Sequence, residues 1–105
     1  MDKAAVLGVL AKFRQALQLQ GINDTRIILF GSHVSGVPRE DSDIDVVVVS
    51  RRFHGKSEWE RIEILSKAIC ASHSLIEAVA LTPQEWDGGE FTVAEFAKEG
   101  EVVAV

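Results

Sequence analysis

The sequence has only one cysteine, Cys70, and its longest apolar runs are short. A lone cysteine excludes a disulfide within the chain, which favours a reducing compartment. A membrane-spanning helix needs roughly 20 consecutive apolar residues, and no run approaches that length. The beginning, MDKAAVLG, contains an acidic residue and leads into a helical pattern, unlike a secretory signal peptide. These features predict a cytoplasmic protein without a membrane segment.

Basic residues are also scarce. The formal net charge is −5, and the longest basic run is Arg51–Arg52. Tight binding to a phosphate backbone usually needs a basic surface, so a nucleic-acid partner is disfavoured. With 47% hydrophobic and 26% charged residues, the composition is that of a folded chain and argues against disorder. The length of 105 residues suits one domain, residues 1–105, with a single modest core.

Apolar spacing and capping residues predict four helices. The first spans about Asp2–Gln20, and the second begins at Ser57 with the capping-box pattern Ser57-x-x-Glu60. Two short helices are expected after Thr82 and after Thr92. The inward stripe expected for the second helix consists of Trp59, Ile62, Leu65 and Ile69. Cys70 lies in the same helix and is interpreted as a packed core residue rather than a nucleophile.

Short β-branched or apolar runs predict the strands. Three strands are expected at Arg26–Phe30, Ile44–Val49 and Leu75–Leu81, and an edge strand or docked tail at Val102–Val105. An edge strand of this kind could pair with the same strand of another copy, so the sequence also allows a homo-oligomer. The alternation of helices and strands predicts an α/β or α+β fold around one small mixed sheet.

Connection lengths predict where the polar residues meet. About a dozen residues separate the first two strands, which favours antiparallel pairing, whereas a full helix between the next two favours a parallel crossover. The end of the first strand and the starts of the next two then share one edge of the sheet. Gly31–Ser32, Asp43, Asp45 and Glu77 are therefore expected to lie close together.

The residue types at this edge predict a metal and phosphate site. Asp43 and Asp45 point to the same face of a strand, where two ionised carboxylates repel each other without a cation. Hard oxygen ligands suit Mg²⁺, and a third acid, Glu77, allows two ions to clamp a phosphoryl-type displacement. Ser32 follows a glycine that lets the backbone approach a ligand closely, as a phosphate cradle requires.

The residues Gly31-Ser32, Gly36 and Ser42-Asp43-Ile44-Asp45 resemble the motif of the nucleotidyltransferase superfamily that includes DNA polymerase beta. In size and layout the chain is most similar to the minimal nucleotidyltransferases of prokaryotes, which are often antitoxin partners of HEPN-domain proteins. The resemblance covers nearly the whole chain from Thr25 onward and implies the palm-like fold of that superfamily.

The resemblance implies transfer of a nucleoside monophosphate, AMP from ATP, to a hydroxyl with release of pyrophosphate. Gly31, Ser32, Gly36 and Ser42 would bind the nucleotide. Asp43 and Asp45 would bind two Mg²⁺ ions, and Glu77 would be the third catalytic acid and metal ligand. The acceptor can be a tyrosine of a HEPN toxin, which would make the chain a protein adenylyltransferase.

The chain departs from many relatives after the Gly-Ser pair. His33 and Ser35 occupy positions where those relatives carry basic residues, although Arg39 could supply a phosphate contact from the loop. Two hypotheses therefore remain. The chain is either an active Mg²⁺-dependent enzyme, which the complete acid set favours, or a catalytically weak binding module that neutralises a toxin by contact alone.

Overall fold

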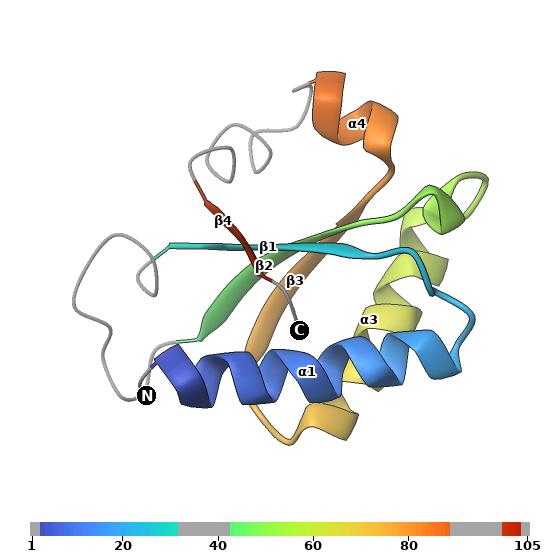
Figure 1. Cartoon of the computed structure of the whole chain (residues 1–105). Coiled ribbons are helices and arrows are strands. Elements are labelled where there is room, and N and C mark those ends of the chain that lie inside the picture. The colour runs from blue at the N-terminus through green and yellow to red at the C-terminus, as the bar shows by residue number, and fades with distance from the viewer. Residues whose placement is uncertain (1–2, 32–42, 89–99, 104–105) are drawn as a thin grey trace.

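The computed structural model describes residues 3–31, 43–88 and 100–103 (Figure 1). Within these ranges, three α-helices, one short 3₁₀ helix and four strands follow one another along the chain. In chain order they are α1 (Lys3–Leu19), β1 (Arg26–Phe30), β2 (Ile44–Val49), η1 (Arg51–Phe53), α3 (Glu58–Ser72), β3 (Ile76–Leu81), α4 (Pro83–Gly88) and β4 (Glu101–Val103). No helix in the described ranges is both long and apolar enough to cross a membrane.

The strands form one mixed sheet in the order β3-β2-β1-β4. β1 is antiparallel to both β2 and β4, whereas β2 and β3 are parallel and are joined through α3. The antiparallel first pair and the parallel second pair are both as predicted from the connection lengths. The predicted edge strand at the carboxyl end is confirmed as β4, over Glu101–Val103.

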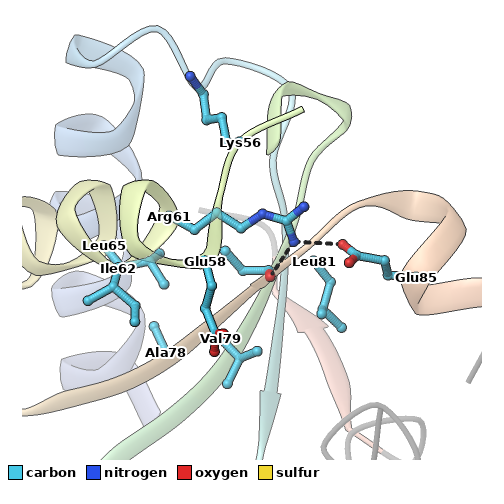
Figure 2. Close-up of a pocket in the computed structure, with 10 residues that line it drawn as sticks. Lys56, Glu58, Arg61, Ile62, Leu65, Ala78, Val79, Leu81 and Glu85 are labelled. Carbon is cyan, nitrogen blue, oxygen red and sulfur yellow. Dashed lines mark hydrogen bonds and ion pairs between the residues drawn. The ribbon is translucent and has the colours of Figure 1, made fainter. Parts of the chain in front are cut away.

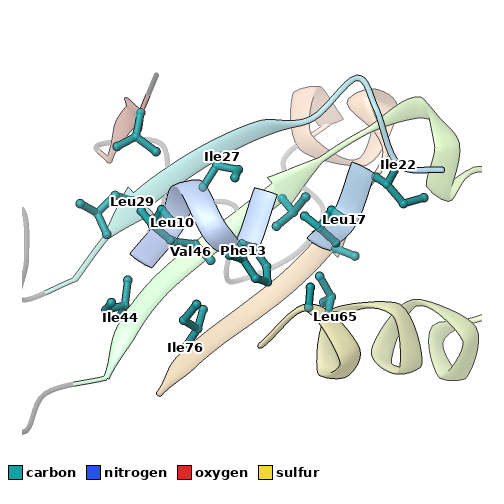
Figure 3. Close-up of a cluster of buried hydrophobic side chains, with 14 of the residues drawn as sticks. Leu10, Phe13, Leu17, Ile22, Ile27, Leu29, Ile44, Val46, Leu65 and Ile76 are labelled. Atoms are coloured by element: carbon teal, nitrogen blue, oxygen red, sulfur yellow. The ribbon is translucent and has the colours of Figure 1, made fainter. Parts of the chain in front are cut away.

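The main core lies between the sheet and the two long helices (Figure 3). Four apolar residues of α1 recur at helical spacing and are all buried, as the sequence predicts. Alternate strand residues and the inner side of α3 complete this cluster. Large buried contributors include Leu10, Phe13, Leu17, Ile22, Ile27, Leu29, Ile44, Val46, Phe53, Leu65 and Ile76.

The opposite face of the sheet carries a second, smaller apolar cluster. It consists of Ile28, Val47, Val49 and Leu81, with Trp86 of α4 packed against it. Side chains of a strand alternate between faces, so residues 45, 47 and 49 of β2 share this second face. The second face is therefore apolar along most of its length and polar where β2 begins.

α3 begins at Ser57 with the predicted capping box. The Ser57 hydroxyl accepts from the Glu60 N–H at 3.1 Å, and the Glu60 carboxylate accepts from the Ser57 N–H at 3.1 Å. The helix ends at His73, whose backbone has a left-handed conformation with φ of 56°. α4 begins with Pro83 in its first turn, also as predicted.

The sequence predicts that Trp59 and Ile62 of α3 face the core and that Cys70 is buried, and these three predictions are wrong. Trp59 is 69% and Ile62 46% exposed, and Cys70 is exposed as well. The side of α3 that faces the core is set by Leu65, Ala68 and Ser72. At 100° per residue, Trp59 and Cys70 point roughly away from that side, whereas Ile62 lies at its rim.

Candidate active site

Asp45 and Glu77 are direct neighbours across the parallel pair of strands. The register aligns Asp45 of β2 with Glu77 of β3, and Asp45 shares the second face with Val47 and Val49. Asp43 lies immediately before β2, two residues from Asp45. The three acids therefore gather where β2 and β3 begin, on the sheet face away from α1 and α3, as the sequence predicts.

Contacts among the acids are reflected in the protonation of Glu77. The pKa of the Glu77 carboxyl is raised, first by a hydrogen bond with Asp43, then by one with Asp45 and by the negative charges of both. Negative charges held this close disfavour the ionised form of Glu77. Without a divalent ion, the Glu77 carboxyl therefore keeps its proton to a higher pH than an isolated glutamate does.

The raised pKa of Glu77 predicts a pH-dependent stability difference. In divalent-free buffer, Glu77→Gln should gain stability relative to wild type as pH rises, because only the native glutamate must give up a proton beside two aspartates. Thermal unfolding in EDTA between about pH 4 and pH 8 measures this difference. Glu63→Gln, at an exposed position of α3, serves as the control and should show no such trend. A pH-independent difference for Glu77→Gln would contradict the prediction.

The donor set suits a magnesium site, although it is not a closed one. Carboxylate oxygens are the ligands that Mg²⁺ prefers, and Mg²⁺ usually completes its shell with water and substrate phosphate. Within the described ranges, no three His, Cys, Asp or Glu side chains are grouped so that they could hold a metal ion as they stand. Glu77 forms hydrogen bonds with both aspartates, and these contacts must open before its carboxylate can bind a cation.

Gly31 leaves the space that the Asp45 carboxylate occupies. It follows β1 directly, and the register pairs the preceding residue, Phe30, with Asp45. A Cβ atom on Gly31 would lie 2.5 Å from Oδ2 and 3.3 Å from Cγ of Asp45, and the Gly31 φ angle is 79°. Both the left-handed backbone and the close approach require glycine here. Besides the nucleotide contact expected from the sequence, Gly31 therefore has a positioning role toward Asp45.

Gly31→Ala is expected to weaken Mg²⁺-ATP binding by more than about tenfold, because the new methyl group displaces the Asp45 carboxylate. Gly55→Ala is a matched control, since Gly55 has the same φ of 79° but nothing within 4 Å of its Cβ position. Both variants should lose about 1–2 kcal/mol of unfolding free energy from left-handed strain. Titration calorimetry and urea unfolding measure the two effects. Equal nucleotide affinity in the two variants would argue against the positioning role.

The remaining nucleotide-binding residues expected from the sequence lie outside the described residues. These are Ser32, Gly36 and Ser42, together with the neighbouring His33 and Arg39. Their predicted contacts with the triphosphate remain predictions. The structure thus describes the three acids of the expected site. The phosphate-binding residues after Gly31 are predicted from the sequence motif alone.

A family model described as "Nucleotidyltransferase domain" matches residues 10–78, more than half of the chain. The match contains Gly31 and all three acids. The chain belongs to the nucleotidyltransferase domain family. The structure also resembles the crystal structure of a "putative nucleotidyltransferase" from Sulfolobus solfataricus, with a TM-score of 0.57 and 18% sequence identity.

That similarity extends over 97% of this chain and 87% of the other, and at this identity it shows a shared fold. No match was found among curated proteins. Nucleotidyltransferases transfer a nucleoside monophosphate group, and the family membership supports a transferase. The mixed sheet with two helices on one face is the nucleotidyltransferase fold that the resemblance implied.

One polar residue with a defined place in the structure, Arg61, was not identified from the sequence. Arg61 lies on the inner side of α3, and its side chain is only 16% exposed. It forms an ion pair with Glu85 of α4, and its guanidinium lies over the ring of Phe53. Its position four residues before Leu65, on the buried side of the helix, is the signal that could have identified it.

Proposed function

We propose that this nucleotidyltransferase transfers AMP from ATP, in a Mg²⁺-dependent reaction, to a hydroxyl group of a partner protein. The observation that supports the proposal is the meeting of Asp43, Asp45 and Glu77 at one end of the sheet, where their carboxyl groups contact one another. When all three acids are ionised, their negative charges repel one another unless a cation lies among them. A site of this kind suits a substrate that brings divalent ions with its phosphates.

The three acids have distinct places in the proposed site. Asp43 and Asp45 would hold two Mg²⁺ ions, and Glu77 would complete the ligand set on the side of the neighbouring strand. When bound, the ions would polarise the phosphate oxygens and offset the charge that develops during transfer. Gly31 keeps Asp45 in place, and loss of the Glu77 proton makes its carboxylate available as a ligand.

A protein acceptor is supported by the size and charge of the chain. The resemblance to minimal nucleotidyltransferases points to a HEPN-domain partner with a hydroxyl side chain, and the formal net charge of −5 disfavours a nucleic acid. The described residues comprise one sheet with its two packed faces, so we expect the acceptor to dock as a separate polypeptide. ATP as the donor is proposed from the same resemblance.

Incorporation of label from ATP into the co-purified partner tests the proposal. ATP labelled at the α-phosphate should label the partner in the presence of Mg²⁺, and ATP labelled at the γ-phosphate should not. This pair of labels separates nucleotidyl transfer from phosphoryl transfer. No label from either nucleotide would contradict the proposed activity, and label from the γ-phosphate alone would indicate a kinase.

The second hypothesis from the sequence, neutralisation by contact alone, is favoured by His33 and Ser35 in place of the usual basic residues. The same preparation separates the two. If the partner's own activity is blocked equally well without ATP, and equally well by Asp43→Asn, contact suffices. If the block needs both ATP and Asp43, transfer is the cause.

A further inference from the structure

Leu75 is a large apolar side chain that lies exposed beside the three acids. It immediately precedes β3 and is 72% exposed. Ile76, the next residue, belongs to the main core, so alternation along the strand places Leu75 on the second face together with Glu77. The register aligns Ile44 with Ile76, which places Leu75 opposite Asp43. Leu75 therefore borders two of the three acids.

The backbone of Leu75 is held in place although its side chain is exposed. The Leu75 carbonyl accepts from the Ile44 N–H at 3.1 Å, and this bond begins the parallel ladder between β2 and β3. The turn before it contains His73, whose left-handed backbone ends α3. Leu75 is thus presented from a fixed position. An apolar side chain on a fixed backbone loses little conformational freedom when a partner covers it, which favours its use in binding.

The other large apolar residues that are exposed in the described ranges lie away from the acids. Leu19, Trp59 and Ile62 belong to the helices on the other face of the sheet. Val102 belongs to β4, at the opposite edge of the sheet from β3. Single exposed apolar residues are common on protein surfaces and need no function. Leu75 differs from the others in its place at the rim of the candidate active site.

The far end of β3 is less open than its beginning. Arg61 of α3 donates to the Ala80 carbonyl at 3.2 Å and to the Glu85 carboxylate at 2.7 Å, which closes the edge where β3 ends (Figure 2). Ala80 and Leu81 are both buried. The groove beside them has two basic and two acidic side chains in its lining, so its charge selects no ligand. A partner that reaches the acids across β3 is therefore expected at the beginning of the strand, where Leu75 lies.

The order of the strands indicates from which side an acceptor would reach the site. Gly31 follows β1 on one side of Asp45, and Glu77 of β3 lies on the other side. The phosphate-binding residues expected from the sequence follow Gly31, so pyrophosphate would leave on the side of β1. The acceptor oxygen bonds to the α-phosphorus as the bond to pyrophosphate breaks, and the attacking and leaving oxygens lie roughly in line. The acceptor hydroxyl would therefore approach from the side of β3, where Leu75 is exposed.

We propose that Leu75 contacts the acceptor protein and packs against an apolar side chain near the hydroxyl that receives AMP. The assignment of this partner as the AMP acceptor rests on the proposed function. Leu75 and Glu77 are two residues apart, about 7 Å along the strand, so in an extended acceptor segment the apolar residue would lie about two positions from the hydroxyl. A leucine offers neither charge nor hydrogen bonds to a phosphate backbone, so this position suits a polypeptide better than a nucleic acid.

Binding of the co-purified partner protein, measured without nucleotide, tests the contact. The partner is separated from the chain, labelled with a fluorophore and titrated with wild type and variants. Leu75→Ala should weaken binding at least about fivefold, whereas Leu75→Met, which keeps most of the apolar volume, should bind within about twofold of wild type. Val102→Ala truncates an exposed apolar residue at the other edge of the sheet and, as the matched control, should bind as wild type. Circular dichroism checks that each variant is folded.

Transfer kinetics and calorimetry separate a contact with the acceptor from a contact with the nucleotide. In Leu75→Ala the KM for the partner should rise at least about fivefold, whereas kcat and the affinity for Mg²⁺-ATP should stay within about twofold of wild type. Equal partner affinity in Leu75→Ala and wild type would overturn the proposal, as would the absence of any protein that binds the chain. Loss of ATP affinity alone would assign Leu75 to the nucleotide instead. If Leu75→Ala weakens partner binding but wild type transfers no label, the contact stands and the proposed activity fails.

Discussion

Asp45→Asn is expected to lower the rate of nucleotidyl transfer by at least about 10³-fold while leaving the chain folded. Asp45 is the middle member of the acid cluster, two residues from Asp43 and directly opposite Glu77. An amide keeps the shape of the carboxylate but loses the charge that attracts a divalent ion. Several kcal/mol of electrostatic stabilisation are lost with it. Single-turnover transfer from α-labelled ATP measures the rate.

Stability should not fall in this variant. Removal of one negative charge from three neighbouring carboxyl groups relieves repulsion, so the melting temperature of Asp45→Asn in EDTA should equal or exceed that of wild type. Glu63→Gln removes a negative charge from an exposed position of α3 and should retain full activity. Transfer by Asp45→Asn at more than a tenth of the wild-type rate would remove the metal-centred mechanism.

Phe13→Ala is expected to cost about 3–5 kcal/mol of unfolding free energy. Phe13 is fully buried near the middle of α1, where it packs against the sheet among Leu10, Leu17 and Ile27 (Figure 3). Loss of its ring leaves a cavity that rigid neighbours cannot fill. Domains of this size have a total stability of about 5–15 kcal/mol, so much of the margin would be lost. Urea unfolding monitored by circular dichroism measures the change.

Leu19→Ala, in the same helix, is the matched comparison. Leu19 is 86% exposed, so its truncation should change the unfolding free energy by less than about 0.5 kcal/mol. Because both variants replace a large apolar side chain of α1 with alanine, helix propensity changes little between them. Equal losses in the two variants would mean that α1 does not pack on the sheet through Phe13.

The sequence predicts the sheet and its acid cluster well because both follow from local rules. Alternation in a strand places Asp45 with Val47 on one face, and a helix between β2 and β3 makes these strands parallel. Their starts must then coincide, which brings Glu77 beside Asp45. None of these steps depends on the details of packing.

Two residues of the stripe predicted for α3, Trp59 and Ile62, could not be placed in this way, because they do not lie on the buried side of the helix. Arg61 occupies a core-facing position with its aliphatic stem buried and its guanidinium paired with Glu85. Apolar spacing counted from Trp59 therefore places Leu65 and Ile69 correctly against the core, but it wrongly assigns Trp59 and Ile62 to the interior. The space that Gly31 leaves for the Asp45 carboxylate likewise depends on how the turn after β1 lies beside β2, and no local pattern in the sequence predicts it.

The parallel register of β2 and β3 limits which changes of chain length the site can tolerate. Asp45 lies opposite Glu77 in that register, and consecutive residues of a strand point to opposite faces of the sheet. A shift of β3 by one residue would therefore turn Glu77 toward α1 and α3 and away from Asp45. We expect insertions or deletions between α3 and β3 to preserve activity only where this alignment is kept.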